Sequence, residues 1–535
     1  MKTDKPSILM IVIDALRADC APFAEPSAHL RAIGLKAPDL PALTRLVRGA
    51  RSFTQAIACS SYTSACHGSL FTGLVPAEHG VRAFSVTALS REVHPLAEIL
   101  TEAGYATCAM SDQPLFFQPQ GLLRGFQLFL TAEEEALAWW DSYEGIPRFL
   151  FMHLWDIHQP YGMHVGRAYR SSYSQIIEFW RNRLRSKNLV IPAMTDSPFE
   201  DPERYHVGLM QQIWQNEVGF KAGMDDYLAG LALFDRGRLK DLVAAFAARG
   251  LLDGDTVVVV TSDHGEGRDI PPSQLTRHGN SLTDDQIRIP LYLRIPGLSG
   301  PDKIGQQVSQ ADIAPTLLDA LGLLSERTPP RSPCNGRSLL PLLRGQSLPE
   351  QAAYAEISTV YKDPTDNRQE PGTGRYPIIR YRMLRYPHRK YWLVGKPVTA
   401  DDETLVAPTE ELLQVLFHDI LGRRPTPEES AQWLKRIEDI PATDIARRRA
   451  LVQDFERSGE FRHLPKYAMF DLLRDPLELK PVDARQKTTL WVEYAPQLAI
   501  MNEIDQNARE GEPLVSNEAD EAVILRRLQG LGYVE

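Results

Sequence analysis

The run ILMIVID, residues 8–14, decides the fold expected for this chain. Its first six residues are apolar and rich in β-branched side chains, and the run is short, which is typical of a strand covered on both faces. Similar runs recur at 149–154, 256–261 and 290–295, and helical patterns separate them at 41–48, 95–103 and 227–248. This alternation predicts an α/β fold with a mainly parallel central sheet and helices on both faces.

Acidic and histidine side chains directly follow three of these predicted strands. Asp14 ends the first run, Asp156 and His158 follow the run 149–154, and Asp263 and His264 follow the run 256–261. The carboxyl ends of parallel strands form one edge of a sheet, where ligands bind in this class of fold. We therefore expect these side chains to surround one site.

The pair Asp263-His264 places a carboxylate and an imidazole side by side, and Asp14 adds a second carboxylate. Taken alone, an aspartate in the position of Asp14 is as often a helix N-cap as a ligand. Oxygen and nitrogen donors together favour zinc or manganese, with magnesium or calcium as alternatives, because calcium binds oxygen almost exclusively. The combination predicts a divalent metal site with these three residues as ligands.

Composition narrows the class of protein. A chain of 535 residues with 43% hydrophobic residues can bury a large core in two or three units. The net charge of -10 argues against nucleic acid as a partner. No apolar run approaches the roughly 20 residues of a membrane span. The five cysteines are scattered and odd in number, which favours free thiols and a cytoplasmic location.

Changes of pattern along the chain indicate its domains. Residues 1–345 are expected to form the catalytic α/β domain, and residues 346–405 with 465–535 a smaller α+β subdomain and tail. Residues 406–464 have helical periodicity and are expected to be an inserted module. The aromatic and basic segment 169–185 could cap the cleft or pack on the surface.

The segment CSSYTSACHGSLFTGLVPAEHGV, residues 59–81, carries a family resemblance. Its part 69–81 resembles the signature Ser-Leu-Leu-Thr-Gly-Leu-Tyr-Pro-x-x-His-Gly-Val of the sulfatase family, in the alkaline phosphatase superfamily. In that family the signature follows the nucleophile motif Cys-x-Pro-Ser-Arg at fixed spacing. On this spacing the nucleophile position falls on Thr63 and the arginine position on His67.

Further motifs of the family match in order along the chain. Residues 14–19 look like its first metal motif, residues 263–266 like its second, and His278-Gly279 like its anion-contact motif. The C-terminal landmarks match at 309–322, 335–340, 470–478 and 528–534. The resemblance covers roughly residues 7–400 and 465–535, and it implies the alkaline-phosphatase/sulfatase-like fold.

Departures from the family pattern shift the expected reaction. Classical sulfatases convert the motif cysteine or serine into formylglycine, and threonine is not a substrate for that conversion. The resemblance therefore implies that Thr63 attacks as a metal-held alkoxide, as in the superfamily's phosphodiesterases and phospho-group transferases. Ala15 and His264 replace an aspartate and an asparagine of many sulfatases, which disfavours calcium.

The leading hypothesis is a hydrolase that cleaves phosphate mono- or diesters through a Thr63-bound covalent intermediate. A sulfuric ester hydrolase without formylglycine, a phospho-group transferase and a non-catalytic anion-binding protein are the alternatives. The expected substrate is a small-molecule, glycan-linked or lipid-linked phosphate or sulfate ester. The sequence is also compatible with a homo-oligomer.

The number of bound ions depends on three further residues. If two ions are bound, which we slightly favour, Asp156, His158 and His278 are expected as the second ligand set. If one ion is bound, His158 and His278 would contact the ester oxygens or protonate the leaving group. Together with Thr63 and His67 they are the candidate catalytic residues. His153, inside the second strand, is expected to be a buried histidine of the core.

Residues 412–461 have a resemblance of their own. The stretch LFHDILGRRP at 416–425, Trp433-Leu434 and FERSGEFR at 455–462 look like the helical domain of unknown function 4214, found in bacterial surface and glycan-related proteins. This DUF4214-like module could be a plain helical decoration. Alternatively, it could bind a protein partner or orient the substrate.

Overall fold

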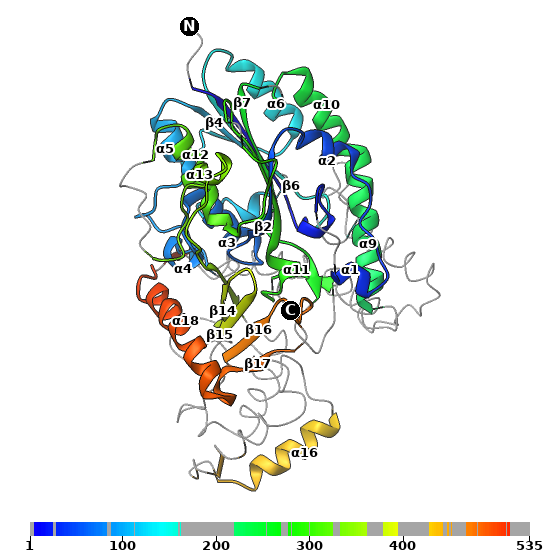
Figure 1. The fold of residues 1–535 in the computed structure, drawn as a ribbon, viewed down its shortest axis with the longest axis vertical. Helices are drawn as coiled ribbons and strands as arrows, with labels where there is room; N and C mark the ends of the chain where they lie inside the picture. The colour runs from blue at the N-terminus through cyan, green and yellow to red at the C-terminus, as the bar shows by residue number, and fades with distance from the viewer. Residues whose placement is uncertain are drawn as a thin grey trace, which may run out of the picture. The chain divides into compact units, whose positions relative to one another are not determined.

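The computed structural model describes residues 5–24, 28–82, 87–111, 113–158, 161, 219–252, 254–268, 276–279, 281–298, 300–324, 332–360, 378–393, 427–441, 444, 447–448, 451, 467–478, 480–509 and 511–513. The chain divides into two compact units, residues 1–377 with 502–535 and residues 378–501. The predicted α/β class is confirmed by the first unit (Figure 1).

A nine-stranded sheet runs through the described part of the first unit in the order β11-β2-β10-β7-β1-β6-β4-β5, with β12 paired to β2. The strands are β1 Ser7–Ile13, β2 Arg51–Ile57, β4 Ala106–Ser111, β5 Leu128–Leu130, β6 Arg148–Leu154, β7 Thr256–Thr261, β10 Arg288–Arg294, β11 Lys303–Ile304 and β12 Val308–Ser309. Strands β7, β1, β6, β4 and β5 are parallel. Strand β10 runs antiparallel to both β7 and β2, so the sheet is mainly but not wholly parallel.

Helices cover both faces of this sheet. In Figure 1, α2, α9 and α10 lie along one side of the strands, and α5, α12 and α13 lie on the other. The helices of the unit are α1 Ala28–Ala32, α2 Pro41–Leu46, α3 Thr63–Thr72, α4 Pro76–His79, α5 Leu96–Glu102, α6 Glu133–Ser142, α9 Gly219–Phe234, α10 Lys240–Ala248, α11 Asp284–Ile287, α12 Ile313–Ala320 and α13 Leu340–Leu343. A π-helical turn, Asp235–Leu239, joins α9 to α10.

Strand β1 is buried on both faces, as its unbroken apolar sequence predicts. Leu9, Ile11 and Ile13 belong to a buried apolar cluster that includes side chains of α2 and α10. The alternate residues Ile8 and Met10 are also fully buried, and they point to the opposite face because side chains alternate along a strand. Burying a Leu or Ile side chain contributes about 1.5–3 kcal/mol, so this strand anchors the sheet.

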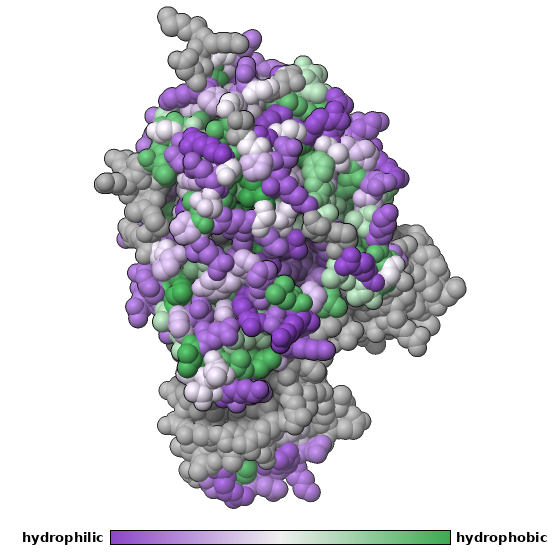
Figure 2. Space-filling model, in the orientation of Figure 1, coloured by the Kyte–Doolittle hydropathy of each residue, from purple (hydrophilic) through white to green (hydrophobic). Residues whose placement is uncertain are grey.

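Short strand pairs and a further strand complete the first unit. They are β3 Thr87–Ala88 with β18 Glu512–Pro513, β8 Gly267–Arg268 with β9 Thr276–Arg277, and β13 Ala353–Val360. On the face shown in Figure 2, hydrophilic residues predominate among the described ones, and apolar residues form small groups. Among the described residues, no helix has the length and apolarity needed to cross a membrane.

The second unit contains antiparallel strands. They are β14 Ile378–Arg385, β15 Arg389–Leu393, β16 Tyr467–Asp471 and β17 Val482–Asp483, and the helix α18 Thr488–Gln506 begins in this unit. Lys390 of β15 and Glu478 form a fully buried ion pair of 2.5 Å. Burial of a charge requires such a partner, because an unpaired buried charge costs several kcal/mol.

Several expectations fall largely outside the described residues. The amphipathic segment 169–185 lies outside them. Of the predicted module 406–464, the described part includes one helix, α16 Pro427–Glu438. The division of the chain after residue 377 and before residue 502 differs from the predicted boundaries at 345, 405 and 464. The DUF4214-like module stays a prediction.

Candidate active site

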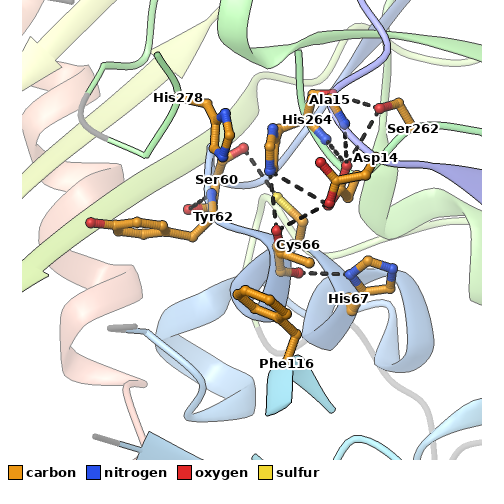
Figure 3. Close-up of polar contacts among 12 residues, drawn as sticks. Asp14, Ala15, Ser60, Tyr62, Cys66, His67, Phe116, Ser262, His264 and His278 are labelled. Carbon is orange, nitrogen blue, oxygen red and sulfur yellow. Dashed lines mark hydrogen bonds and ion pairs between the residues drawn. The ribbon is translucent and has the colours of Figure 1, made fainter. Parts of the chain in front are cut away.

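The ends of two neighbouring strands meet the first turn of helix α3. Asp14 follows β1 and His264 follows β7 (Figure 3). Thr63 is the first residue of α3. The Thr63 Oγ1 atom lies 3.4 Å from Asp14 Oδ2 and 3.3 Å from His264 Nε2. All three side chains are fully buried. The structure thus brings together residues that are up to 250 positions apart, as the strand-end pattern and the motif spacing predict.

Backbone hydrogen bonds fix the orientation of Asp263 and His264. Asp263 Oδ1 accepts hydrogen bonds from the backbone N–H groups of Ala15 (3.1 Å) and His264 (2.8 Å). His264 Nδ1 lies 2.9 Å from the Gly265 carbonyl oxygen, so it donates and the lone pair resides on Nε2, which faces Thr63. Asp263 Oδ2 and the remaining Asp14 oxygen have no hydrogen-bond partner among the described residues.

The two carboxylates of this site repel each other. Burial raises the pKa of Asp14 to about 7, and the charge of Asp263 adds to that shift. Burial acts in the same direction on Asp263, but electrostatic attraction to the nearby His264 and His153 outweighs it and places the pKa of Asp263 well below its usual range. Two buried acids side by side are stable only with compensating positive charge. The site therefore suits a cation.

The donor atoms fit a divalent cation. Asp14, Asp263 and His264 each offer one ligand atom, and these atoms lie within 4.8 Å of one another. Asp14 and Asp263 each also have one buried carboxylate oxygen without a hydrogen-bond partner among the described residues, and such an atom costs about 1–3 kcal/mol unless something binds it. A bound divalent ion would neutralise both acids and polarise an ester oxygen placed against it.

Backbone strain is stored at Ala15, next to the metal-ligand candidate Asp14. Ala15 has a φ of 55°, in the left-handed region that costs a residue with a side chain about 1–2 kcal/mol. Its N–H donates to Asp263 and its carbonyl accepts a hydrogen bond from the Tyr227 hydroxyl at 3.0 Å. These hydrogen bonds hold the turn that follows β1. The strained backbone conformation of Ala15 is thus part of the turn that positions Asp14.

Thr63 sits where a negative charge is stabilised. Tyr62 is the N-cap of α3, so Thr63 occupies the first helical position of a ten-residue helix. The unpaired N–H groups and the positive end of the helix dipole favour an anion there by about 0.3–1 kcal/mol or more when buried. An alkoxide at Thr63, or an ester oxyanion beside it, would gain from this position.

His67 lies one turn after Thr63 and is electrically neutral. Its Nδ1 donates to the Thr63 carbonyl oxygen at 2.7 Å, and its ring packs edge-on against Phe117 and His153. Burial lowers the pKa of His67 to about 3, and the charge of His153 adds to this. A neutral ring cannot replace the positive charge of an arginine. Because the proton is on Nδ1, His67 instead has a lone pair on Nε2 at the arginine position.

His153 is the residue of this site that the sequence interpretation missed. It was expected in the core, and it is fully buried, but its Nε2 lies 3.2 Å from Asp14 Oδ2 and 3.9 Å from Asp263 Oδ2. Burial lowers its pKa, but the hydrogen bond with Asp14 and the charges of Asp14 and Asp263 outweigh burial and raise the pKa of His153 to about 9. Its position one residue before the end of an apolar strand was the available signal.

His278 and His158 follow His264 in a row of ring contacts. The His278 ring stacks on His264 with centroids 4.3 Å apart, and its Nδ1 lies 3.1 Å from Glu266 Oε2. The His158 ring contacts His278 edge-on at 4.9 Å and stacks on Trp155 at 3.8 Å. His278 therefore lies beside the ligand candidate His264, and His158 lies beside His278.

Asp156 is directed to a different partner. Its Oδ2 forms a buried ion pair of 2.7 Å with Arg238 Nη1, and Arg238 also binds Glu133. The groups of potential ligands among the described residues are Asp14, Asp263 and His264, and His67, His153 and Asp263. The structure thus does not gather Asp156, His158 and His278 into the expected second ligand set.

Arg17 is engaged in a salt bridge. Its guanidinium is 1% exposed and contacts both carboxylate oxygens of Asp19, at 2.7 and 2.9 Å. Its Nη1 donates to the carbonyl oxygen of Glu266, in the loop after β7. Arg17 therefore connects the loops that follow β1 and β7 and does not point a free charge into the site.

The chain is similar in sequence to a known family and to known proteins. The family model described as Sulfatase matches residues 6–323. Arylsulfatase K of Xenopus laevis is 28% identical over 204 residues, which are 38% of this chain and 36% of that protein. The match thus spans about a third of the length of this relative.

Solved structures share the fold over almost the whole chain. A structure from a study of glycosaminoglycan metabolism by Bacteroides thetaiotaomicron covers 94% of this chain and 97% of its own, with a TM-score of 0.57 and 16% identity. The phosphonate monoester hydrolase of Agrobacterium radiobacter covers 94% and 96%, with a TM-score of 0.55 and 18% identity. At these identities the likeness concerns the fold alone.

Asp14→Asn should lower the stabilisation by metal, because it removes a ligand of the ion held by Asp14, Asp263 and His264. Adding Zn²⁺ or Mn²⁺ to the metal-free wild type at 100 times its Kd should stabilise it by about 2.7 kcal/mol, because the ion binds the folded state. In metal-free protein, the raised pKa of Asp14 means that its charge costs stability as pH rises from 3.8 toward about 7. At neutral pH the metal-free variant should thus melt no lower than the wild type.

Differential scanning fluorimetry with and without metal measures both effects. Asp302→Asn is the matched control, because this carboxylate is 98% exposed and should keep the full metal response. A metal response in Asp14→Asn equal to that of the wild type would exclude Asp14 as a ligand.

Proposed function

The chain belongs to the sulfatase family of hydrolases in the alkaline phosphatase superfamily, and on this basis we propose that it cleaves phosphate mono- or diesters with Thr63 as the nucleophile. The observation that carries the proposal is the position of the Thr63 hydroxyl, 3.4 Å from Asp14 Oδ2 and 3.3 Å from His264 Nε2 at the start of α3. A nucleophile within reach of a carboxylate and an imidazole is the arrangement expected for covalent catalysis.

A zinc or manganese ion held by Asp14, Asp263 and His264 would lower the pKa of the Thr63 hydroxyl and withdraw charge from the ester. Thr63 Oγ1 gives up its proton to Asp14 Oδ2, to which it donates at 3.4 Å, and attacks phosphorus. The bond from phosphorus to the leaving oxygen breaks, and a phosphothreonine forms. His278 stacks on His264, His158 contacts His278, and either imidazole can protonate the departing oxygen. Water then attacks phosphorus and restores Thr63.

The threonine itself favours phosphate over sulfate. Family members that cleave sulfate esters use formylglycine, and Thr63 cannot be converted into it. A sulfuric ester hydrolase remains the second candidate because the curated relatives include Arylsulfatase K, and sulfate would then be displaced by unmodified threonine. A phospho-group transferase would differ only in the acceptor that resolves the intermediate.

We also propose a cellular location, a substrate class and a role for the helical module. The five cysteines are free and buried, which supports a cytoplasmic location. The substrate would be a small-molecule, glycan-linked or lipid-linked ester. Residues 406–464 would form the DUF4214-like module and bind a partner or orient that substrate.

Thr63→Ala should lower kcat on the preferred ester by at least about 1000-fold, because the covalent step is lost. Thr63→Ser keeps a hydroxyl at the same position and should retain measurable turnover. When the reaction is quenched, mass spectrometry should find a phosphoryl group on the peptide that contains residue 63. Ser64→Ala is the matched control, since the Ser64 hydroxyl donates to the Phe116 carbonyl oxygen. Full activity in Thr63→Ala would refute the proposed nucleophile.

Paired substrates separate the two candidate functions. With 4-nitrophenyl phosphate, bis(4-nitrophenyl) phosphate and 4-nitrophenyl sulfate under the same conditions, kcat/KM should be at least about 100-fold higher for a phosphate ester than for the sulfate. The release of 4-nitrophenolate reports all three reactions. A preference for the sulfate ester that disappears in Thr63→Ala would instead establish the second candidate.

A further inference from the structure

A second group of potential metal ligands adjoins the first. His67, His153 and Asp263 each offer one ligand atom, these atoms lie within 4.8 Å of one another, and all three side chains are fully buried. The residues come from helix α3, strand β6 and the loop after β7. Asp263 belongs to both groups.

His67 is oriented to bind a cation. Its Nδ1 keeps its proton because it donates to the Thr63 carbonyl oxygen at 2.7 Å, so the lone pair is on Nε2. That atom is buried and has no hydrogen-bond partner among the described residues. An orphaned buried nitrogen costs about 1–3 kcal/mol and requires an explanation, which a metal ion would provide.

His153 and Asp263 are held in matching orientations. His153 Nδ1 lies 3.2 Å from Ser111 Oγ, so Nε2 faces Asp14 and Asp263, and an ion at Nε2 would replace its 3.2 Å hydrogen bond to Asp14 Oδ2. Asp263 uses Oδ1 for two backbone hydrogen bonds, whereas Oδ2 has no hydrogen-bond partner among the described residues. Such outer contacts fix the tautomer and ring orientation of metal-binding histidines.

The surroundings of His67 also favour ligation. Its ring lies against Phe71, Phe117 and Phe151, with centroids 4.8–5.8 Å away. This aromatic wall offers Nε2 no polar partner, and it lowers the local dielectric, which strengthens the attraction between an ion and its ligands. Two imidazoles and one carboxylate are a donor set that zinc accepts readily.

We propose that His67, His153 and Asp263 hold a second divalent cation beside the one held by Asp14, Asp263 and His264, with Asp263 bridging the two. On the spacing of the resembling motif, an arginine stands at the position of His67. A neutral histidine supplies no charge by itself, but an ion bound to it would restore positive charge next to Thr63. The two ions together would offset the repulsion between Asp14 and Asp263.

Metal content tests this proposal without any substrate. Purified full-length protein is stripped with chelator, reloaded with Zn²⁺, passed through a desalting column and analysed by inductively coupled plasma mass spectrometry. The wild type should retain two ions per chain. His67→Ala and His153→Ala should each retain one, while the melting curve shows that the variant is folded.

Two control variants make the result specific. His278→Ala removes an imidazole that stacks on His264 but belongs to neither ligand group, so it should retain two ions. Loss of an ion in that variant would assign the second site to His278 and overturn the proposal. Thr63→Ala should also retain two ions even where turnover is lost, which separates this proposal from that of the nucleophile.

Crystals of the zinc-loaded wild type provide a test that needs no variant. Anomalous difference maps at the zinc edge should show two peaks, one of them in contact with His67 Nε2 and His153 Nε2. A single peak among Asp14, Asp263 and His264, or retention of two ions by His67→Ala, would overturn the proposal.

Discussion

Two aspartates buried side by side set the main constraint on this structure. Asp14 and Asp263 are both fully buried, and each keeps one carboxylate oxygen without a hydrogen-bond partner among the described residues. Their repulsion must be balanced by positive charge. The parallel arrangement of β1 and β7 brings them together, and the strained turn at Ala15 holds the geometry. His153, whose pKa is raised to about 9, contributes part of that charge, and a bound cation would contribute the rest.

Much of this arrangement could be predicted from local sequence. Short apolar runs predict buried strands, and β1, β6 and β7 follow them within one residue at either end. The rule that ligands bind at strand ends then places Asp14, Asp263 and His264 together, while motif spacing identifies Thr63. The direction of β10 could not be predicted, because an apolar run is the same read either way and only pairing with β7 and β2 decides it.

The remaining site residues depend on contacts that span long distances in the chain. Asp156 has the sequence context of a ligand, but Arg238, 82 positions away, binds it. His153 has the context of a core residue, but its strand lies next to β1, so its ring reaches Asp14. His67 matches an arginine position in the family, and only its aromatic surroundings reveal that the ring is neutral. Sequence reasoning identifies residue types, whereas packing decides which of them meet.

A crystal structure of the metal-loaded protein with orthovanadate tests the central claim, that the Thr63 hydroxyl attacks an ester at a cation held by Asp14, Asp263 and His264. Vanadate adopts the five-coordinate geometry of phosphoryl transfer. We expect vanadium bonded to Thr63 Oγ1, with the cation contacting both carboxylates and His264 Nε2. Vanadate bound elsewhere, or a Thr63 hydroxyl turned away from a cation at these ligands, would contradict it.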